Sequence, residues 1–125
     1  MLKMFLITGV GGFFGSGLRY LSQRIISHYF PVTFPYGTLI VNLIGCFLIG
    51  VIFAMSDKTR ILSPDIRMFL AVGFCGGFTT FSSFALDSYG LIRDSEYLYF
   101  SLYLLASVIL GILAVIAGIW SIKSL

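Results

Sequence analysis

The sequence contains few charged side chains. Eight Lys or Arg and five Asp or Glu occur among its 125 residues, so charged residues make up 10% of the chain, against about 25% in an ordinary soluble domain. Hydrophobic residues make up 58%, which is more apolar surface than a domain of this size can bury inside itself. This composition excludes a soluble enzyme, a nucleic-acid-binding protein and a disordered chain, and it indicates a protein embedded in a membrane.

Histidine and cysteine, which often build catalytic and metal sites, are also scarce. The single histidine, His28, lies in an expected connection between helices, and Cys46 and Cys75 lie in separate apolar stretches without a CxxC pair. Isolated cysteines of this kind are typical packing residues rather than parts of a disulfide or a metal site. The sequence offers no triad or ligand cluster and does not predict an enzyme.

Four apolar stretches occupy most of the chain. Met4–Leu18 has 15 residues without a charge, Gly37–Met55 and Met68–Leu86 have 19 each, and Tyr97–Ile122 has 26. A helix needs about 20 residues to cross the hydrocarbon core of a bilayer, so the last three stretches qualify directly. The first must include Arg19, which can snorkel from a helix end to the headgroups. A signal peptide is the alternative for the first stretch, but no Ala-x-Ala site follows it.

Short connections are expected between these helices, at residues 22–35, 56–65 and 93–96, where prolines or charged residues interrupt the apolar pattern. No repeat or linker divides the chain. We therefore predict one domain, residues 1–125, which is an all-α membrane protein with four transmembrane helices.

The basic residues are divided almost evenly between the two ends of such a bundle. Four crossings place both termini on one side of the membrane. The terminal side then carries Lys3, Lys58, Arg60, Arg67 and Lys123, and the other side carries Arg19, Arg24 and Arg93. Because cytoplasmic loops carry an excess of Lys and Arg, this small difference selects an orientation only weakly. Two copies inserted in opposite orientations could pair as an antiparallel homodimer.

The third apolar stretch has an unusual centre. Gly76 and Gly77 are followed by Thr79, Thr80, Ser82 and Ser83, with phenylalanines at positions 78, 81 and 84. A glycine pair is a poor helix former, so we expect the third helix to be broken near its middle. Irregular backbone at this depth is found where it is buried in protein or lines a cavity, and such breaks can present carbonyl oxygens to a cation. The phenylalanine stripe suits either core packing or a pathway.

Polar side chains also recur at helical spacing on the second and fourth stretches. Thr38, Asn42 and Cys46 lie four residues apart, as do Tyr103, Ser107 and Gly111, so each set shares one helix side. Hydrogen bonding between packed helices is one interpretation, and the lining of a polar path is the other. Gly11 and Gly15 form a GxxxG pattern that favours close helix packing.

Three motifs together resemble a known family, the Fluc fluoride channels, also called CrcB proteins. The motifs are Gly11-Gly12-x-x-Gly15 leading to Arg19-Tyr20, then Gly37-Thr38-Leu39-x-Val41-Asn42-x-x-Gly45, and the third-stretch string Gly73-Phe74-Cys75-Gly76-Gly77-Phe78-Thr79-Thr80-Phe81-Ser82-Ser83-Phe84. The resemblance implies a passive, fluoride-selective channel of the cell membrane, which exports fluoride from the cytoplasm and lowers its toxicity. It also implies an antiparallel homodimer with two pores.

The resemblance assigns roles to individual residues. Asn42, Phe81 and Phe84 would contact fluoride, and backbone carbonyls of Gly76 and Thr79 from both subunits would hold a structural Na⁺ at the dimer centre. Fluoride is small and strongly hydrated, so hydrogen-bond donors must replace its water; the expected donors besides Asn42 are Thr38, Ser82, Tyr103 and Ser107. Arg19 would either attract anions toward a vestibule or snorkel to lipid headgroups.

Two alternatives remain open at this point. A small four-helix multidrug or cation antiporter needs a carboxylate in mid-span, and the only candidate, Asp87, follows the third stretch and is expected near a span end. A non-transporting membrane scaffold would use the same small and polar residues for packing alone.

Overall fold

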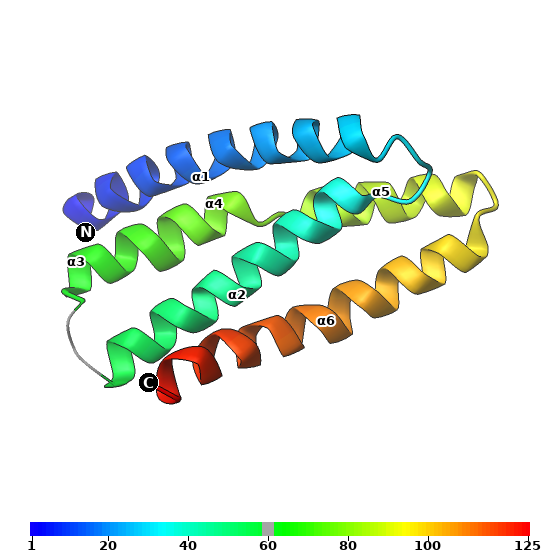
Figure 1. Cartoon of the computed structure of the whole chain (residues 1–125). Helices are drawn as coiled ribbons and strands as arrows, with labels where there is room; N and C mark the ends of the chain where they lie inside the picture. Colours follow the sequence, from blue (N-terminus) through cyan, green and yellow to red (C-terminus); the bar gives the residue numbers. More distant parts are fainter. Residues whose placement is uncertain (59–61) are drawn as a thin grey trace.

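The computed structural model describes residues 1–58 and 62–125, and within those ranges it contains helices and no strand. The helices are α1 (Leu2–Tyr29), α2 (Tyr36–Lys58), α3 (Pro64–Arg67), the π-helical segment η1 (Met68–Cys75), α4 (Gly76–Phe78), α5 (Phe81–Arg93) and α6 (Tyr97–Lys123). Figure 1 shows α1, α2, α6 and the run from α3 to α5 lying alongside one another, with both termini at the same end of the molecule.

Three segments of the described chain are long and apolar enough to cross a membrane. They are Tyr36–Asp57, Pro64–Arg93 and Tyr97–Lys123, with mean hydropathies of 2.5, 1.5 and 2.7. These segments confirm the second, third and fourth predicted spans, and the chain is a multi-pass membrane protein.

The first helix is longer than the sequence indicated. α1 continues to Tyr29, so the expected connection from residue 22 was wrong at its start. Residues 22–29 contain neither proline nor glycine, and the chain leaves the helix at Phe30 because the following Pro31 disfavours helical backbone before it. Arg19 therefore lies inside α1 rather than at its end. The predicted turn at residues 93–96 is confirmed, since α5 ends at Arg93 and α6 begins at Tyr97.

Glycines allow the backbones of neighbouring helices to approach closely. A Cβ atom added to Gly15 of α1 would overlap the carbonyl oxygen of Phe74 in η1, and one added to Gly118 of α6 would overlap that of Phe47 in α2. Small residues at helix interfaces are the usual means of packing in lipid, where van der Waals contact replaces the hydrophobic effect. The GxxxG pattern of α1 thus serves packing, as the sequence favoured.

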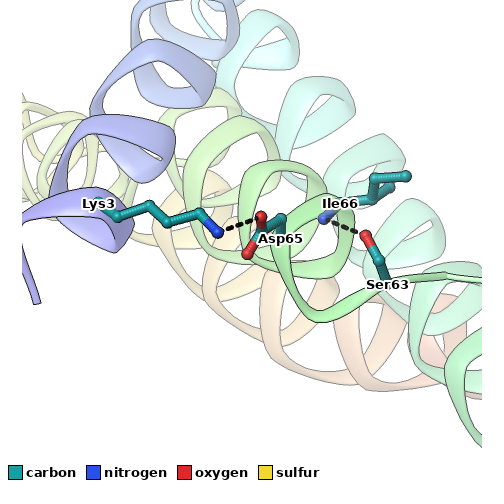
Figure 2. A network of polar contacts seen from close by, with 4 residues as sticks. All are labelled: Lys3, Ser63, Asp65 and Ile66. Carbon is teal, nitrogen blue, oxygen red and sulfur yellow. Dashed lines mark hydrogen bonds and ion pairs between the residues drawn. The ribbon is translucent and has the colours of Figure 1, made fainter.

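An ion pair links the start of α1 to the start of α3, and a capping hydrogen bond lies beside it within the α3 segment (Figure 2). Lys3 Nζ lies 2.9 Å from Asp65 Oδ2, and the Ile66 N–H donates to Ser63 Oγ at 3.2 Å. Ser63 caps the helix, which satisfies one of the N–H groups left free at a helix start. Because the ion pair is exposed, it adds little stability, and its role is to hold these two helix ends side by side.

Candidate functional site

The helical run from α3 to α5 is interrupted at Thr79 and Thr80, which confirms the predicted break near its middle and is visible in Figure 1. Thr79 has ψ 157° and Thr80 has φ −150° and ψ 114°, so both are extended. Gly76, however, is helical, with φ −63° and ψ −37°. The glycine pair does not itself unwind the helix: a Cβ added to Gly77 would lie 2.8 Å from the Gly12 carbonyl oxygen, so this glycine lets α4 pack against α1.

The side chain of Asn42 holds the break from α2. Its Oδ1 accepts the Thr80 N–H at 2.7 Å, and its Nδ2 donates to the Thr80 carbonyl oxygen at 3.1 Å. In a continuous helix the Thr80 N–H would donate to the carbonyl of Gly76, four residues earlier. Because Asn42 takes this N–H, the carbonyl oxygen of Gly76 loses its helical donor.

Hydroxyl groups satisfy the remaining backbone around the break. Thr79 Oγ1 donates to the Cys75 carbonyl oxygen at 2.9 Å. Thr80 Oγ1 accepts the Ser83 N–H at 3.1 Å and so caps the start of α5. Ser82, predicted as a fluoride donor, is exposed and has its Oγ 3.3 Å from Thr80 Oγ1. The sequence analysis missed Thr80, although a threonine three residues before Ser83 is a usual capping position.

Arg19 lies beside the same break. Its Nε donates to the Gly77 carbonyl oxygen at 3.1 Å, across from α1 to α4. α4 ends one residue later, and a positive charge near the carbonyl end of a helix is favourable. The structure thus brings Arg19 to the end of α4.

Two phenylalanine rings follow the break. The ring centroids of Phe81 and Phe84 are 5.6 Å apart, and those of Phe84 and Tyr103 are 5.1 Å apart. Phe84 is half-buried and Tyr103 is fully buried, whereas Phe81 is 79% exposed. The rings therefore form a row from the bundle interior to its surface.

A central hollow of about 360 Å³ lies between α2, the break and α6. It is lined by Asn42, Gly45, Cys46, Ile49, Cys75, Gly76, Thr79, Thr80, Phe81, Phe84, Ser107 and Val108. Six predicted site residues meet here: Asn42, Gly76, Thr79, Phe81, Phe84 and Ser107. Thr38, Ser82, Tyr103 and Arg19 lie outside its lining.

A second hollow, the loop-end hollow, measures about 310 Å³ and includes residues of the connection between α1 and α2. Thr38, Gln23 and Asp87 line it. Gln23 Nε2 donates to Thr38 Oγ1 at 3.2 Å, and the Tyr103 hydroxyl donates to Asp87 Oδ2 at 3.1 Å. Sequence reasoning missed Gln23, whose position one helical turn after Arg19 was the available signal.

Comparisons with known proteins agree with one another. The family model described as "CrcB-like protein, Camphor Resistance (CrcB)" matches residues 6–119. A protein named "Fluoride-specific ion channel FluC" from Chlorobium chlorochromatii (strain CaD3) is 49% identical over 120 residues, which cover 94% of this chain and 91% of that protein. Proteins of the same name from Phocaeicola vulgatus and Leptospira interrogans serovar Lai are 44% identical over 119 residues and 42% identical over 122 residues. The Phocaeicola match covers 95% of this chain and 98% of that protein, and the Leptospira match covers 98% of this chain and 96% of that protein.

Proposed function

The chain belongs to the CrcB family, whose relatives are named as ion channels rather than enzymes, and we propose that it is a passive, fluoride-selective channel that exports fluoride from the cytoplasm and lowers its toxicity. One observation carries the proposal at the level of geometry. The broken helix, the Asn42 amide and the two phenylalanine rings meet at one hollow within membrane-spanning segments.

The chemistry of the central hollow suits a small anion. The Asn42 amide has two N–H groups, of which one is donated to Thr80, so a second remains for an ion. Ser107 adds a hydroxyl, and the rings of Phe81 and Phe84 have positive edges. No lysine or arginine is among the described residues that line the hollow. Fluoride can then be attracted without being trapped, as conduction requires.

The loop-end hollow is suited to be the entrance through which fluoride reaches the central hollow. Thr38 lies in its wall, one helical turn before Asn42. Tyr103 donates its only O–H to Asp87, so its contribution is a ring edge beside Phe84 rather than the hydroxyl proton that the sequence suggested. Arg19 keeps its positive charge while it donates to Gly77, and that charge attracts anions toward the break.

We infer a fourth crossing and an antiparallel homodimer. α1 has 28 residues, which at 1.5 Å each reach about 42 Å and exceed the hydrocarbon thickness. Phe81 is 79% exposed and Gly76 is also exposed, so the central hollow is open on one side. A second copy in the opposite orientation would cover it, and the even distribution of basic residues permits both orientations.

We also propose the structural Na⁺ at the dimer centre. Within the described residues no group of three His, Cys, Asp or Glu could hold a metal ion, so backbone oxygens would be its ligands. The Gly76 carbonyl fits this role because Thr80 no longer donates to it, and the Thr79 carbonyl adjoins it at the break. The ion would supply positive charge where the two breaks meet.

Two substitutions distinguish a cation-binding role of Gly76 and Thr79 from a role in packing within one subunit. A Cβ added to Gly76 meets nothing closer than the Ala71 carbonyl at 4.0 Å, so Gly76→Val has room inside one subunit. We expect Gly76→Val to lower the dimer fraction in detergent and to abolish its dependence on Na⁺ concentration, whereas Thr79→Ser keeps its backbone oxygen and changes neither. A Gly76→Val dimer that still responds to Na⁺ would argue against the site.

Flux measurements test the proposed function. The purified protein is reconstituted in potassium-loaded liposomes, and an ionophore dissipates the membrane potential that builds up when an anion leaves. Ion-selective electrodes follow the release of fluoride and chloride. We expect rapid fluoride release, far ahead of chloride, only when the ionophore is present. Equal release of the two anions, or rapid fluoride release without a counter-ion pathway, would contradict a passive and selective channel.

A further inference from the structure

A third hollow lies toward the end of the molecule that carries both chain termini. It measures about 360 Å³ and is bounded by α2 from Ile49 to Asp57, by Arg67 of α3 and by Ala71 of η1. We call it the terminal-end hollow. None of the predicted fluoride contacts lines it. The end of α2 and α3, which line it, lie at the end of the bundle opposite the α1–α2 connection, which lines the loop-end hollow (Figure 1).

The terminal-end hollow and the central hollow lie next to each other along α2. Ile49 lines both. The α2 residues that line the three hollows include Thr38, Asn42, Ile49 and Ser56, and with Cys46 and Ile52 between them the spacing is three or four residues throughout. Such spacing places them on one side of a helix. One side of α2 therefore contributes to all three hollows.

The terminal-end hollow holds a hydrogen-bond donor without a partner. Ser56 Oγ is buried and makes no hydrogen bond among the described residues, although a buried hydroxyl is normally satisfied by protein, water or a ligand. Arg67 lines the same hollow, and the ion pairs found in the described chain involve other residues. A free hydroxyl and an unpaired guanidinium are the groups that a small anion requires.

Asp57 adds a negatively charged side chain to the same hollow. Its carboxylate lies in the wall with Ser56 and Arg67 and repels anions, so it opposes tight binding. A mouth that conducts must attract an ion and still release it. The presence of one cationic and one anionic side chain in the hollow suits transient binding of an anion better than tight binding.

We propose that the terminal-end hollow is the second mouth of the fluoride pathway, where the Ser56 hydroxyl and the Arg67 guanidinium bind the anion after it passes Ile49. The proposal rests on the proposed channel function. It extends the pathway beyond the central hollow along α2 and adds an anion site at the end that carries the chain termini.

Charge placed at Ser56 tests the mouth directly. Ser56→Cys is treated in detergent with a negatively charged methanethiosulfonate reagent, labelling is confirmed by mass, and the protein is then reconstituted. A negative charge fixed at this site lowers fluoride release by about tenfold or more, because repulsion at contact distance is strong in a partly dry site. Treated wild-type protein controls for the native cysteines, and Ser124→Cys, an exposed position near the C-terminus, controls for charge at the same end.

Each result decides the question. Loss of flux in labelled Ser56→Cys, with treated wild type and Ser124→Cys unchanged, supports the mouth. Full flux after complete labelling, or a folded variant whose thiol does not react, overturns it. If wild-type protein released no fluoride, the channel function itself would fail, which is a separate result.

A second variant keeps the proposal falsifiable if Ser56→Cys does not fold. Arg67→Gln removes the charge from an exposed side chain and should lower fluoride release several-fold at about 10 mM salt, with the difference lost near 1 M, because the screening length falls from about 30 Å to about 3 Å. Arg67→Lys should restore the rate. Wild-type flux in Arg67→Gln at low salt would overturn the role of this residue.

Discussion

Replacing Asn42 with alanine should loosen the helix break, because this side chain accepts the Thr80 N–H, which would donate to the Gly76 carbonyl in a continuous helix. The variant leaves the Thr80 N–H without the acceptor that now lies at 2.7 Å, whereas the Thr80 carbonyl oxygen, at the N-cap of α5, loses the amide at 3.1 Å but keeps the first bond of that helix. An orphaned buried group costs about 1–3 kcal/mol, and contacts in membrane proteins fall toward the low end of such ranges. We therefore expect a loss of about 1–3 kcal/mol in the free energy of unfolding, which is the cost of leaving the Thr80 N–H without its partner.

Thr38→Ala is the matched control on the same helix. Thr38 is buried one turn before Asn42, and its hydroxyl accepts a bond from Gln23 at 3.2 Å and also interacts with the Tyr103 hydroxyl. Gln23 lines the loop-end hollow, where water can replace the lost partner. The control should lose about 1–2 kcal/mol, as expected for two ordinary hydrogen bonds of which water can replace one.

Unfolding in mixed micelles, titrated with a denaturing detergent, measures both variants. Hydrogen exchange at the Thr80 amide gives a local measure, because this proton is protected only while Asn42 holds it. We expect faster exchange at Thr80 in Asn42→Ala and no change there in Thr38→Ala. Equal stabilities for the two variants, together with an unchanged exchange rate at Thr80, would refute the view that Asn42 holds the break.

Two further predictions concern the phenylalanine rings beside the break and the packing of α1 against η1. Phe81→Ile and Phe84→Ile should keep the dimer but conduct poorly, because isoleucine preserves most of the apolar volume and lacks a positive ring edge; wild-type flux in both would assign these residues to packing alone. Gly15→Ala should destabilise the fold by about 1–3 kcal/mol through overpacking, since its Cβ would overlap the backbone of η1. Gly9→Ala, whose Cβ would meet nothing within 4 Å, should be neutral in the same unfolding titration.

The spans and the packing glycines could be predicted from the sequence because each follows from a local pattern. Length and hydropathy define a crossing whatever surrounds it, and the GxxxG spacing of Gly11 and Gly15 fixes one face of a helix. The end of α1 was missed because several of residues 22–29 are polar or charged, and polarity alone does not end a helix. The break at Thr79 and Thr80 was expected at the glycine pair, since helix propensity is local.

What ends the helix is a contact between distant segments. The side-chain oxygen of Asn42 accepts the N–H of Thr80 in place of the helical carbonyl. The helix propensities of residues 76–80 contain no information about this contact with α2. The same holds for the hydroxyl of Tyr103, which the sequence predicts as a fluoride donor and which donates to Asp87 at 3.1 Å in the fold. Asn42, Phe81 and Phe84 were identified through the motif, and the fold brings all three to the central hollow. Their roles toward fluoride remain predictions.

The reversal potential of fluoride current in a planar bilayer tests the central proposal most directly. With a tenfold fluoride gradient and equal chloride on both sides, a passive fluoride-selective channel should reverse at about 59 mV, which is the voltage equivalent of a tenfold ratio for one charge. The potential should follow the fluoride gradient when it is changed and should ignore a chloride gradient. A reversal near zero under the fluoride gradient, or one that follows chloride or protons, would contradict the account.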